Sequence, residues 1–337
     1  MDDNAVKALF LPFENGEVPH PADGESWLFL NAGLPLASDF RWQDHLECVQ
    51  GFRPAFVQLK QSGYRVAPEN RSFPCSGALV LLGKHRELNR RNVLAAIEQT
   101  LPGAAILVAG AKTSGVQSMR KEMSLLVSIG QSLSKYHAQV FWFSRPEKRV
   151  PVSLQPAVNI FVGEHGFETA PGMFSHKAID AGSALLAAYL KDVKGKVADF
   201  GAGWGYLSAE LLLKCKGVSS LDLYDADYAA LEAARRNLQR LQTSTPLGFH
   251  WLDLSREPVP PVYDFVIMNP PFHTGRSADT GLGERFIAAA SKALKLGGRM
   301  LMVANKQLSY ENTLQTSFRM FERIGEDRQY KVIRAAK

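Results

Sequence analysis

The residues best suited to chemistry lie in the stretch Asp264-Phe-Val-Ile-Met-Asn-Pro-Pro-Phe-His273. The side-chain oxygen of Asn269 and the carbonyl oxygen of Pro270 can each accept a hydrogen bond from an amino group. Pro270 and Pro271 fix the backbone, and Phe272 offers a ring face on which a planar base can stack. Such a turn can hold a ring-conjugated amine with its lone pair directed at an electrophile, so that positioning does most of the work. We therefore predict Asn269, Pro270, Pro271 and Phe272 as catalytic residues.

A histidine ends the same stretch. His273 could act as a base, but an amine that gains a substituent can afterwards release its proton to solvent, so no strong base is needed. We therefore interpret His273 as a positioning or surface residue.

A glycine-rich turn, Val197-Ala-Asp-Phe-Gly-Ala-Gly-Trp-Gly205, forms a second candidate site. Gly201 and Gly203 allow the backbone to turn tightly and to approach a ligand closely. Asp199 distinguishes between ligands, because a carboxylate at this place would repel the pyrophosphate of a dinucleotide. S-adenosylmethionine carries a sulfonium cation and no phosphate. We therefore predict that Asp199, Gly201 and Gly203 bind S-adenosylmethionine.

Two further acids follow the next strand-like runs. Asp225 lies about 20 residues beyond the glycines, the spacing at which an acid binds both ribose hydroxyls of a nucleoside, and it suits the end of a strand better than Asp222 does. Asp227 is expected to cap the next helix. Asp253 follows the third run and could accept from the adenine amino group. We predict Asp225, Asp253 and Asn269 as further cofactor-binding residues.

These residues need a sheet that brings the ends of several strands together. The second half predicts a doubly wound α/β pattern. We predict strands at Lys196–Phe200, Ser219–Tyr224, Phe249–Leu252, Phe265–Met268 and Met300–Ala304, and helices at Tyr206–Lys214, Tyr228–Leu241 and Glu284–Leu294. In that arrangement the glycine turn, the acids and the Asn-Pro-Pro-Phe turn all follow strands.

The first half has a related pattern without those motifs. We predict strands at Gly77–Gly83, Ala105–Ala109 and Gln139–Phe143 and a helix at Arg91–Leu101. The segment AAIEQTLPGAAILVAGAK, ending at Lys112, aligns with AAASKALKLGGRMLMVANK, ending at Lys306. The halves are therefore interpreted as duplicates, of which the first is degenerate and lacks chemistry.

A segment rich in proline and charge, 144–156, precedes another strand-like run at Val158–Val162. We place the domain boundary in this segment, with a first domain at 1–150 and a catalytic domain at 151–337.

The composition is that of a soluble globular protein. Hydrophobic residues make up 46% of 337 residues and charged residues 21%, with a net charge of +6 that is compatible with a polyanionic partner. The three cysteines are too few and too scattered for a disulfide framework or a metal site, so we predict no metal and a reducing cytoplasm. No run approaches a membrane span, and we expect no membrane partner.

The second half resembles the bacterial ribosomal RNA guanine-N2 methyltransferases, particularly the small-subunit methyltransferase C group. The similar stretches are Pro171–Ser175 with Asp180–Ser183, the DFGAGWG turn, Asn269–Gly275, Val303–Leu314 and KVIRA near the carboxyl end. The first half is similar at GALVLLGKHRELN and VAGAKTSGVQS. Ala202 departs from the cysteine common between these glycines, which matters little because the backbone forms that contact.

The resemblance implies a class I methyltransferase fold, Rossmann-like, preceded by a degenerate methyltransferase-like domain that helps to hold RNA. It implies S-adenosylmethionine as donor and the 2-amino group of a guanine in ribosomal RNA, in the small-subunit 16S rRNA, as acceptor. The partner is then ribosomal RNA or an assembled subunit. It assigns Gly201, Gly203, Asp225 and Asp253 to the cofactor and Asn269–Phe272 to the guanine. A monomer is compatible with the sequence, which assigns no role to Tyr310 or Asn312.

Several other functions stay open. A large-subunit guanine-N2 methyltransferase is one, and the Asn-Pro-Pro-Phe turn also serves enzymes that methylate adenine N6 or a glutamine side chain of a protein. Asp199 opposes a dinucleotide-dependent dehydrogenase. Two intact motifs oppose a non-catalytic RNA-binding protein.

Overall fold

The computed structural model describes the chain except for residues 1–2, 36–37, 71–73, 148–159 and 272–279. It separates into two compact units, 1–158 and 159–337. The boundary expected between residues 150 and 151 lies outside the described residues.

The first unit is built on a sheet with the strand order β3-β2-β1-β4-β5-β7-β6, in which only the pairings of β5 with β7 and of β7 with β6 are antiparallel. Its strands are β1 (Trp27–Leu30), β2 (Leu46–Val49), β3 (Arg65–Ala67), β4 (Cys75–Leu81), β5 (Thr100–Ala111), β6 (Gln131–Lys135) and β7 (Ala138–Ser144), and its helices are α1 (Asp3–Glu14), α2 (Arg53–Gln61), α3 (Arg86–Gln99) and α4 (Val116–Met123).

The second unit repeats this order as β12-β11-β10-β13-β14-β16-β15, again with the last two pairings antiparallel. Its strands are β10 (Gly195–Phe200), β11 (Val218–Asp225), β12 (Leu247–Trp251), β13 (Tyr263–Met268), β14 (Leu294–Asn305), β15 (Met320–Glu326) and β16 (Tyr330–Ala336), preceded by the small hairpin β8 (Ile160–Val162) and β9 (Phe167–Thr169). Its helices are α5 (Ala181–Ala187), α6 (Tyr206–Lys214), α7 (Tyr228–Gln239), α8 (Thr280–Ala293) and α9 (Glu311–Ser317).

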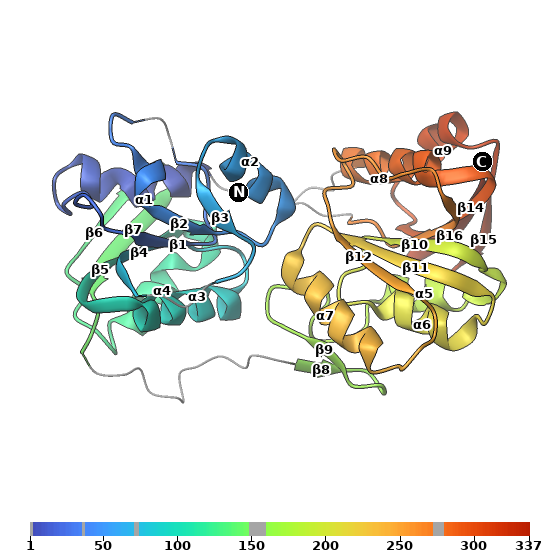
Figure 1. Cartoon of the computed structure of the whole chain (residues 1–337), viewed down its shortest axis with the longest axis horizontal. Coiled ribbons are helices and arrows are strands. Elements are labelled where there is room, and N and C mark those ends of the chain that lie inside the picture. Colours follow the sequence, from blue (N-terminus) through green and yellow to red (C-terminus); the bar gives the residue numbers. More distant parts are fainter. Residues whose placement is uncertain (1–2, 36–37, 71–73, 148–159, 272–279) are drawn as a thin grey trace. The chain divides into compact units, whose positions relative to one another are not determined.

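Each sheet is covered on both faces by helices (Figure 1), which explains why its central strands are continuous apolar runs. In the second unit α5, α6 and α7 pack on one face with Val197 and Ile267, and α8 and α9 pack on the other with Ala198 and Val266. Neighbouring residues of a strand therefore serve opposite cores.

The predicted α/β fold is confirmed in both halves. Helix α6 has the predicted bounds, whereas α3 begins five residues before the predicted Arg91 and ends at Gln99, because Thr100 and Leu101 already belong to β5. Of the strand predicted at Val158–Val162, the part from Ile160 is observed and residues 158–159 lie outside the described residues. Among the described residues, no helix is both long and apolar enough to cross a membrane.

Candidate functional site

The glycine turn follows β10 at the carboxyl end of the sheet, where ligands bind in doubly wound folds. Gly201 and Gly203 have backbone φ angles of 73° and 55°, a region that side chains disfavour. The amides of Gly201 and Ala202 both donate to the carbonyl oxygen of Tyr224, at 2.9 and 3.0 Å. This ties the turn to the end of β11.

Asp225, at the end of β11, braces the turn from beneath. Its Oδ2 accepts from the amide of Gly203 at 2.7 Å and its Oδ1 from the amide of Asp227 at 2.8 Å. Burial raises the pKa of Asp225, and these backbone donors oppose the shift. A carboxylate has about four acceptor sites, so this one could still accept from a ribose hydroxyl, and the predicted cofactor contact is compatible with these backbone hydrogen bonds. Asp227 caps α7 as predicted, accepting from the amides of Ala229 and Ala230.

Asp199 is fully buried beneath the turn and does not line the cavity described below. Its Oδ2 accepts from the hydroxyl of Ser208 on α6 at 2.7 Å. Burial raises its pKa to about 7, and the nearby charge of Asp225 adds to the shift. This geometry suits a carboxyl that supports the turn from behind, and a direct contact with the cofactor stays a prediction.

Asn269 follows β13 and has a well-defined set of partners. Its Nδ2 donates to Asp180 Oδ2 at 2.8 Å and to Ser183 Oγ at 2.7 Å. Its Oδ1 is buried and has no hydrogen-bond partner among the described residues. Buried acceptors are nearly always satisfied, so this oxygen is suited to receive a donor from a ligand.

Asn269 and the glycine turn line one cavity of about 40 Å³. Its lining residues are Phe174, Ser175, Asp180, Ser183, Gly201, Ala202, Gly203, Trp204, Tyr206, Leu207 and Asn269. Among the described residues that line the cavity there is a carboxylate and no basic side chain, which disfavours a phosphate and favours a cation. These walls fit the sulfonium and amino-acid end of S-adenosylmethionine, and the volume shows that the cavity forms only part of a complete cofactor site.

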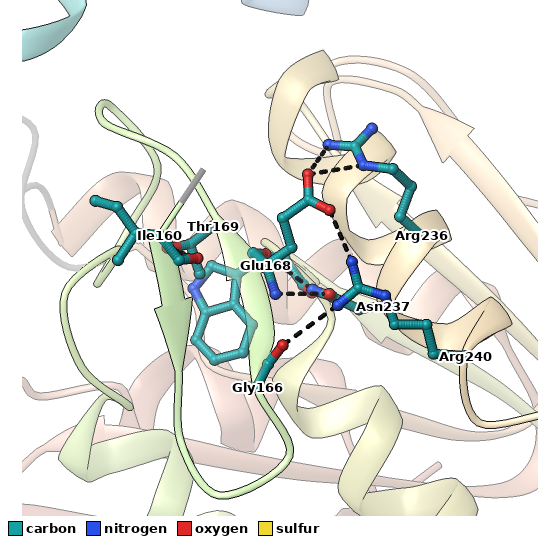
Figure 2. Close-up of polar contacts among 8 residues, drawn as sticks. Ile160, Gly166, Glu168, Thr169, Arg236, Asn237 and Arg240 are labelled. Carbon is teal, nitrogen blue, oxygen red and sulfur yellow. Dashed lines mark hydrogen bonds and ion pairs between the residues drawn. The ribbon is translucent and has the colours of Figure 1, made fainter. Parts of the chain in front are cut away.

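One wall of the cavity is attached to α7 by a polar cluster (Figure 2). The side chain of Asn237 exchanges hydrogen bonds with the backbone of Glu168 on β9, accepting at 2.8 Å and donating at 3.0 Å, and it also donates to the carbonyl oxygen of Trp204 at 2.9 Å. Trp204 Nε1 in turn donates to the carbonyl oxygen of Phe174 at 3.0 Å. Asn237 therefore connects the segment that carries Phe174 to the glycine turn.

The buried carboxylate of Glu168 strengthens this attachment. It pairs with Arg236 at 2.8 Å and with Arg240 at 3.0 Å, both on α7 (Figure 2). Its side chain is 6% exposed and theirs are about half exposed. A charge so buried is tolerated because it is paired.

The other predicted site residues follow the ends of β12 and β13. Asp253 follows β12, is buried and accepts from the amide and hydroxyl of Ser255, at 2.9 and 2.6 Å. Pro270 is buried and Pro271 exposed, beside Asn269. The predicted stacking residue Phe272 and the neighbouring His273 lie outside the described residues.

Tyr310 and Asn312, to which the sequence assigned no role, also lie in the second unit. Tyr310 is fully buried next to α9, where a side chain at Gly283 would strike its ring, and Asn312 is exposed. Tyr310 therefore packs α9 against α8.

Sequence reasoning did not assign roles to Asp180, Ser183 or Asn237. Asp180 carried a usable signal, since Asp is a favoured N-cap residue, and its Oδ2 does cap α5 at the amide of Ser183. Nothing local in the sequence of α7 singles out Asn237.

Comparison with known proteins adds to this geometry. Residues 164–334 match the family model described as Methyltransferase small domain. The protein named ribosomal RNA small subunit methyltransferase C from Idiomarina loihiensis is 30% identical, over 96% of this chain and 95% of its own length. That of Chromohalobacter salexigens is 30% identical over 78% of this chain and 79% of its own length.

A solved structure supports the fold over the whole chain. The 16S rRNA N2 methyltransferase of T. thermophilus, in complex with AdoMet and guanosine, superposes with a TM-score of 0.81 at 24% identity, covering 100% of this chain and 92% of its own. The described fold, the family model and the relatives agree, and this chain belongs to the ribosomal RNA small subunit methyltransferase C family of class I methyltransferases.

Proposed function

We propose that this enzyme methylates the exocyclic N2 amino group of a guanine in 16S ribosomal RNA, with S-adenosylmethionine as the donor. The observation that carries the proposal is the Asn269 amide, whose nitrogen is held by Asp180 and Ser183 and whose oxygen is free to accept from an amino group at a cavity suited to a cation. Ribosomal RNA is proposed as the substrate because the relatives from Idiomarina loihiensis and T. thermophilus are named for it.

The chain's own residues position the two reactants. The backbone of Gly201 to Trp204 with Asp225 would hold the cofactor, Asp253 would receive its adenine, and Asn269, Pro270, Pro271 and Phe272 would hold the guanine. When bound, S-adenosylmethionine supplies an electrophilic methyl group on sulfur. As the guanine nitrogen bonds to that carbon, the carbon–sulfur electron pair goes to sulfur, and the nitrogen later loses a proton to solvent.

Asn269 contributes more in the transition state than in the ground state. The attacking nitrogen becomes positively charged, so a hydrogen bond from it to Asn269 Oδ1 strengthens during the reaction. Orientation of the amine adds to this effect, and well-oriented reactants gain up to about 7–11 kcal/mol.

The test is transfer of labelled methyl from S-adenosylmethionine to purified small and large ribosomal subunits and to their stripped RNAs, followed by nucleoside analysis. We expect N2-methylguanosine from the small subunit or its RNA. The same nucleoside from the large subunit would favour the large-subunit alternative. Label on adenine or on protein would favour the other enzymes with an Asn-Pro-Pro-Phe turn.

We further propose that the first unit holds RNA and that the enzyme works in the cytoplasm. A concavity of about 780 Å³ lies beside α4, and its lining includes Arg120 and Lys121. Both side chains are exposed, and neither forms an ion pair with another described residue. Unpaired cations of this kind attract phosphates and make binding depend on salt.

Lys121→Glu should therefore weaken RNA binding in a filter assay and lower its salt dependence. Lys60→Glu, at an exposed lysine of α2, is the matched control. Equal effects of the two variants would argue against a role for the concavity.

A further inference from the structure

The orientation of the Asn269 amide is set by its surroundings. A carboxylate can only accept hydrogen bonds, so the end of the amide that faces Asp180 must be the nitrogen. The second N–H of that nitrogen donates a hydrogen bond to Ser183 Oγ. The oxygen is consequently the end left for a ligand.

Asp180 is itself held firmly. The Oδ2 atom that accepts from Asn269 also accepts from the amide of Ser183 at 2.8 Å, at the first turn of α5. A Cβ added at Gly182 would lie 3.1 Å from that oxygen and from the ring of Tyr330. The carboxylate is therefore held by the amide of Ser183 and lies close to the backbone of Gly182, which leaves it little freedom to turn.

The charge of Asp180 is uncompensated in the described part of the chain. It forms no ion pair there, and the cavity that it lines has no basic residue among its lining side chains. In the proposed reaction, positive charge moves from sulfur to the attacking nitrogen. A fixed carboxylate that is separated from that nitrogen only by the Asn269 amide attracts this positive charge and therefore stabilises it.

We propose that Asp180 is a positioning residue that directs the oxygen of Asn269 toward the substrate amine and stabilises the positive charge that develops on that amine. This inference rests on the proposed function. In this proposal Ser183 helps to hold the Asn269 amide but contributes no charge.

The decisive variant is Asp180→Asn. An asparagine oxygen can still cap α5 and still accept from Asn269, so the variant removes the charge and keeps the hydrogen bonds. We expect kcat at saturating RNA and S-adenosylmethionine to fall about 10- to 100-fold, with the Tm and the KM for RNA close to those of the unchanged enzyme.

A binding measurement separates charge from shape. Sinefungin carries an ammonium near the place of the transferred methyl group, whereas S-adenosylhomocysteine has a neutral sulfur there. Calorimetry should show that Asp180→Asn weakens sinefungin several-fold more than S-adenosylhomocysteine. A purely structural role of Asp180 would weaken both ligands alike.

Ser183→Ala is the matched control, because it removes a neutral acceptor of the same amide nitrogen. We expect a loss in kcat of about 3- to 10-fold, equivalent to one ordinary hydrogen bond, and an unchanged ratio of the two affinities.

Two results would overturn the inference. One is an Asp180→Asn enzyme with unchanged kcat and an unchanged affinity ratio. The other is weaker S-adenosylmethionine binding with unchanged kcat at saturation, which would make Asp180 a ligand of the cofactor alone. Asn269→Ala keeps the two proposals apart, since normal turnover in that variant rejects the proposed site itself, whereas an inactive Asn269→Ala beside a normal Asp180→Asn rejects only the role of Asp180.

Discussion

The turn after β1 in the first unit and the turn after β10 in the second occupy the same place in two sheets of the same order, yet they handle their backbone polar groups in opposite ways. The registers Leu30↔Val49 and Phe200↔Tyr224 make Asn31 the counterpart of Gly201, with φ angles of 54° and 73°. The left-handed backbone is thus kept in both units.

The residues beneath the two turns differ in polarity. Gln50, the counterpart of Asp225, donates through Nε2 to the carbonyl oxygen of Ala32 at 2.7 Å. Asp225 instead accepts from the amide of Gly203. This amide belongs to the same peptide unit as the carbonyl of Ala202, and Ala202 is the counterpart of Ala32. The same peptide therefore presents its carbonyl in one unit and its amide in the other.

The position of Asn269, the proposed acceptor, differs as well. By the registers with β4 and β13, Leu81 is the counterpart of Asn269, and Asn31 Nδ2 donates to the carbonyl oxygen of Leu81 at 2.8 Å. In the first unit, side-chain amides thus satisfy the backbone internally and an apolar residue replaces the proposed acceptor. A few residues thus distinguish the turn proposed to bind a ligand from the turn whose polar groups are satisfied internally.

The strongest test of this comparison replaces the two counterparts that differ most. Asn269→Ala should lower methyl transfer about 100- to 1,000-fold while S-adenosylmethionine binding stays nearly intact, because one preorganised acceptor is lost. Leu81→Ala should instead destabilise the first unit by about 2–5 kcal/mol. Single-turnover kinetics and denaturant unfolding measure the two effects. Equal losses of activity per folded molecule would contradict the division of roles.

A second test concerns the residues beneath the turns. Asp225→Ala removes the acceptor of Gly203 and the predicted ribose contact, so calorimetry should show about 10- to 100-fold weaker S-adenosylmethionine binding. Gln50→Ala is the control and should lower stability by about 1–3 kcal/mol with the cofactor affinity unchanged. Weaker cofactor binding in the control would mean that the first unit also takes part in it.

A third test uses the buried acid that only the second turn possesses. The pKa of Asp199 is raised to about 7 by burial and then by Asp225, so between about pH 4 and pH 7 the folded state binds more protons than the unfolded state. The contribution of Asp199 to stability is therefore full below pH 4 and is lost as the pH rises through 7. Relative to Asp199→Asn, the unfolding free energy of the unchanged protein should fall over this range, and a constant difference would argue against the raised pKa.

The smallest expected effect tests what the two units share. Gly103 and Gly297 follow the helices α3 and α8 at equivalent places, with φ angles of 78° and 75°, and no atom lies within 4 Å of a Cβ added at either. Substitution by alanine should lower the stability of each unit by about 1 kcal/mol through backbone strain alone, without loss of activity. Calorimetric unfolding would reveal unequal losses, which would weaken the structural equivalence of the units.

The sequence predicts those parts of the fold that depend on local patterns. Apolar runs predict β4, β5, β10, β13 and β14, although the buried central strand β1 was not predicted. The glycine turn together with Asp227 marks the starts of α6 and α7. The edge strands β6 and β15 were not predicted, because their residues are largely exposed and show no apolar alternation.

Only those residues of the candidate site that belong to local sequence motifs could be predicted. Asn269 and the glycines stand out in the sequence, but Asp180 meets Asn269 across 89 positions, and no local pattern reveals such a pairing. The burial of Asp199 likewise depends on Ser208 and the packing of α6, which are tertiary properties.

The bonds between Asn237 and Glu168 also bear on the order in which the chain is made. The two residues are 69 positions apart, so the hairpin of β8 and β9 leaves the ribosome well before the helix that holds it. Until α7 has been synthesised and packed, the backbone of Glu168 lacks its partner and the carbonyl of Trp204 lacks its donor. The wall of the cavity that Asn269 and the glycine turn line is consequently completed late in translation, and a nascent chain cannot form this cavity before most of its second unit exists.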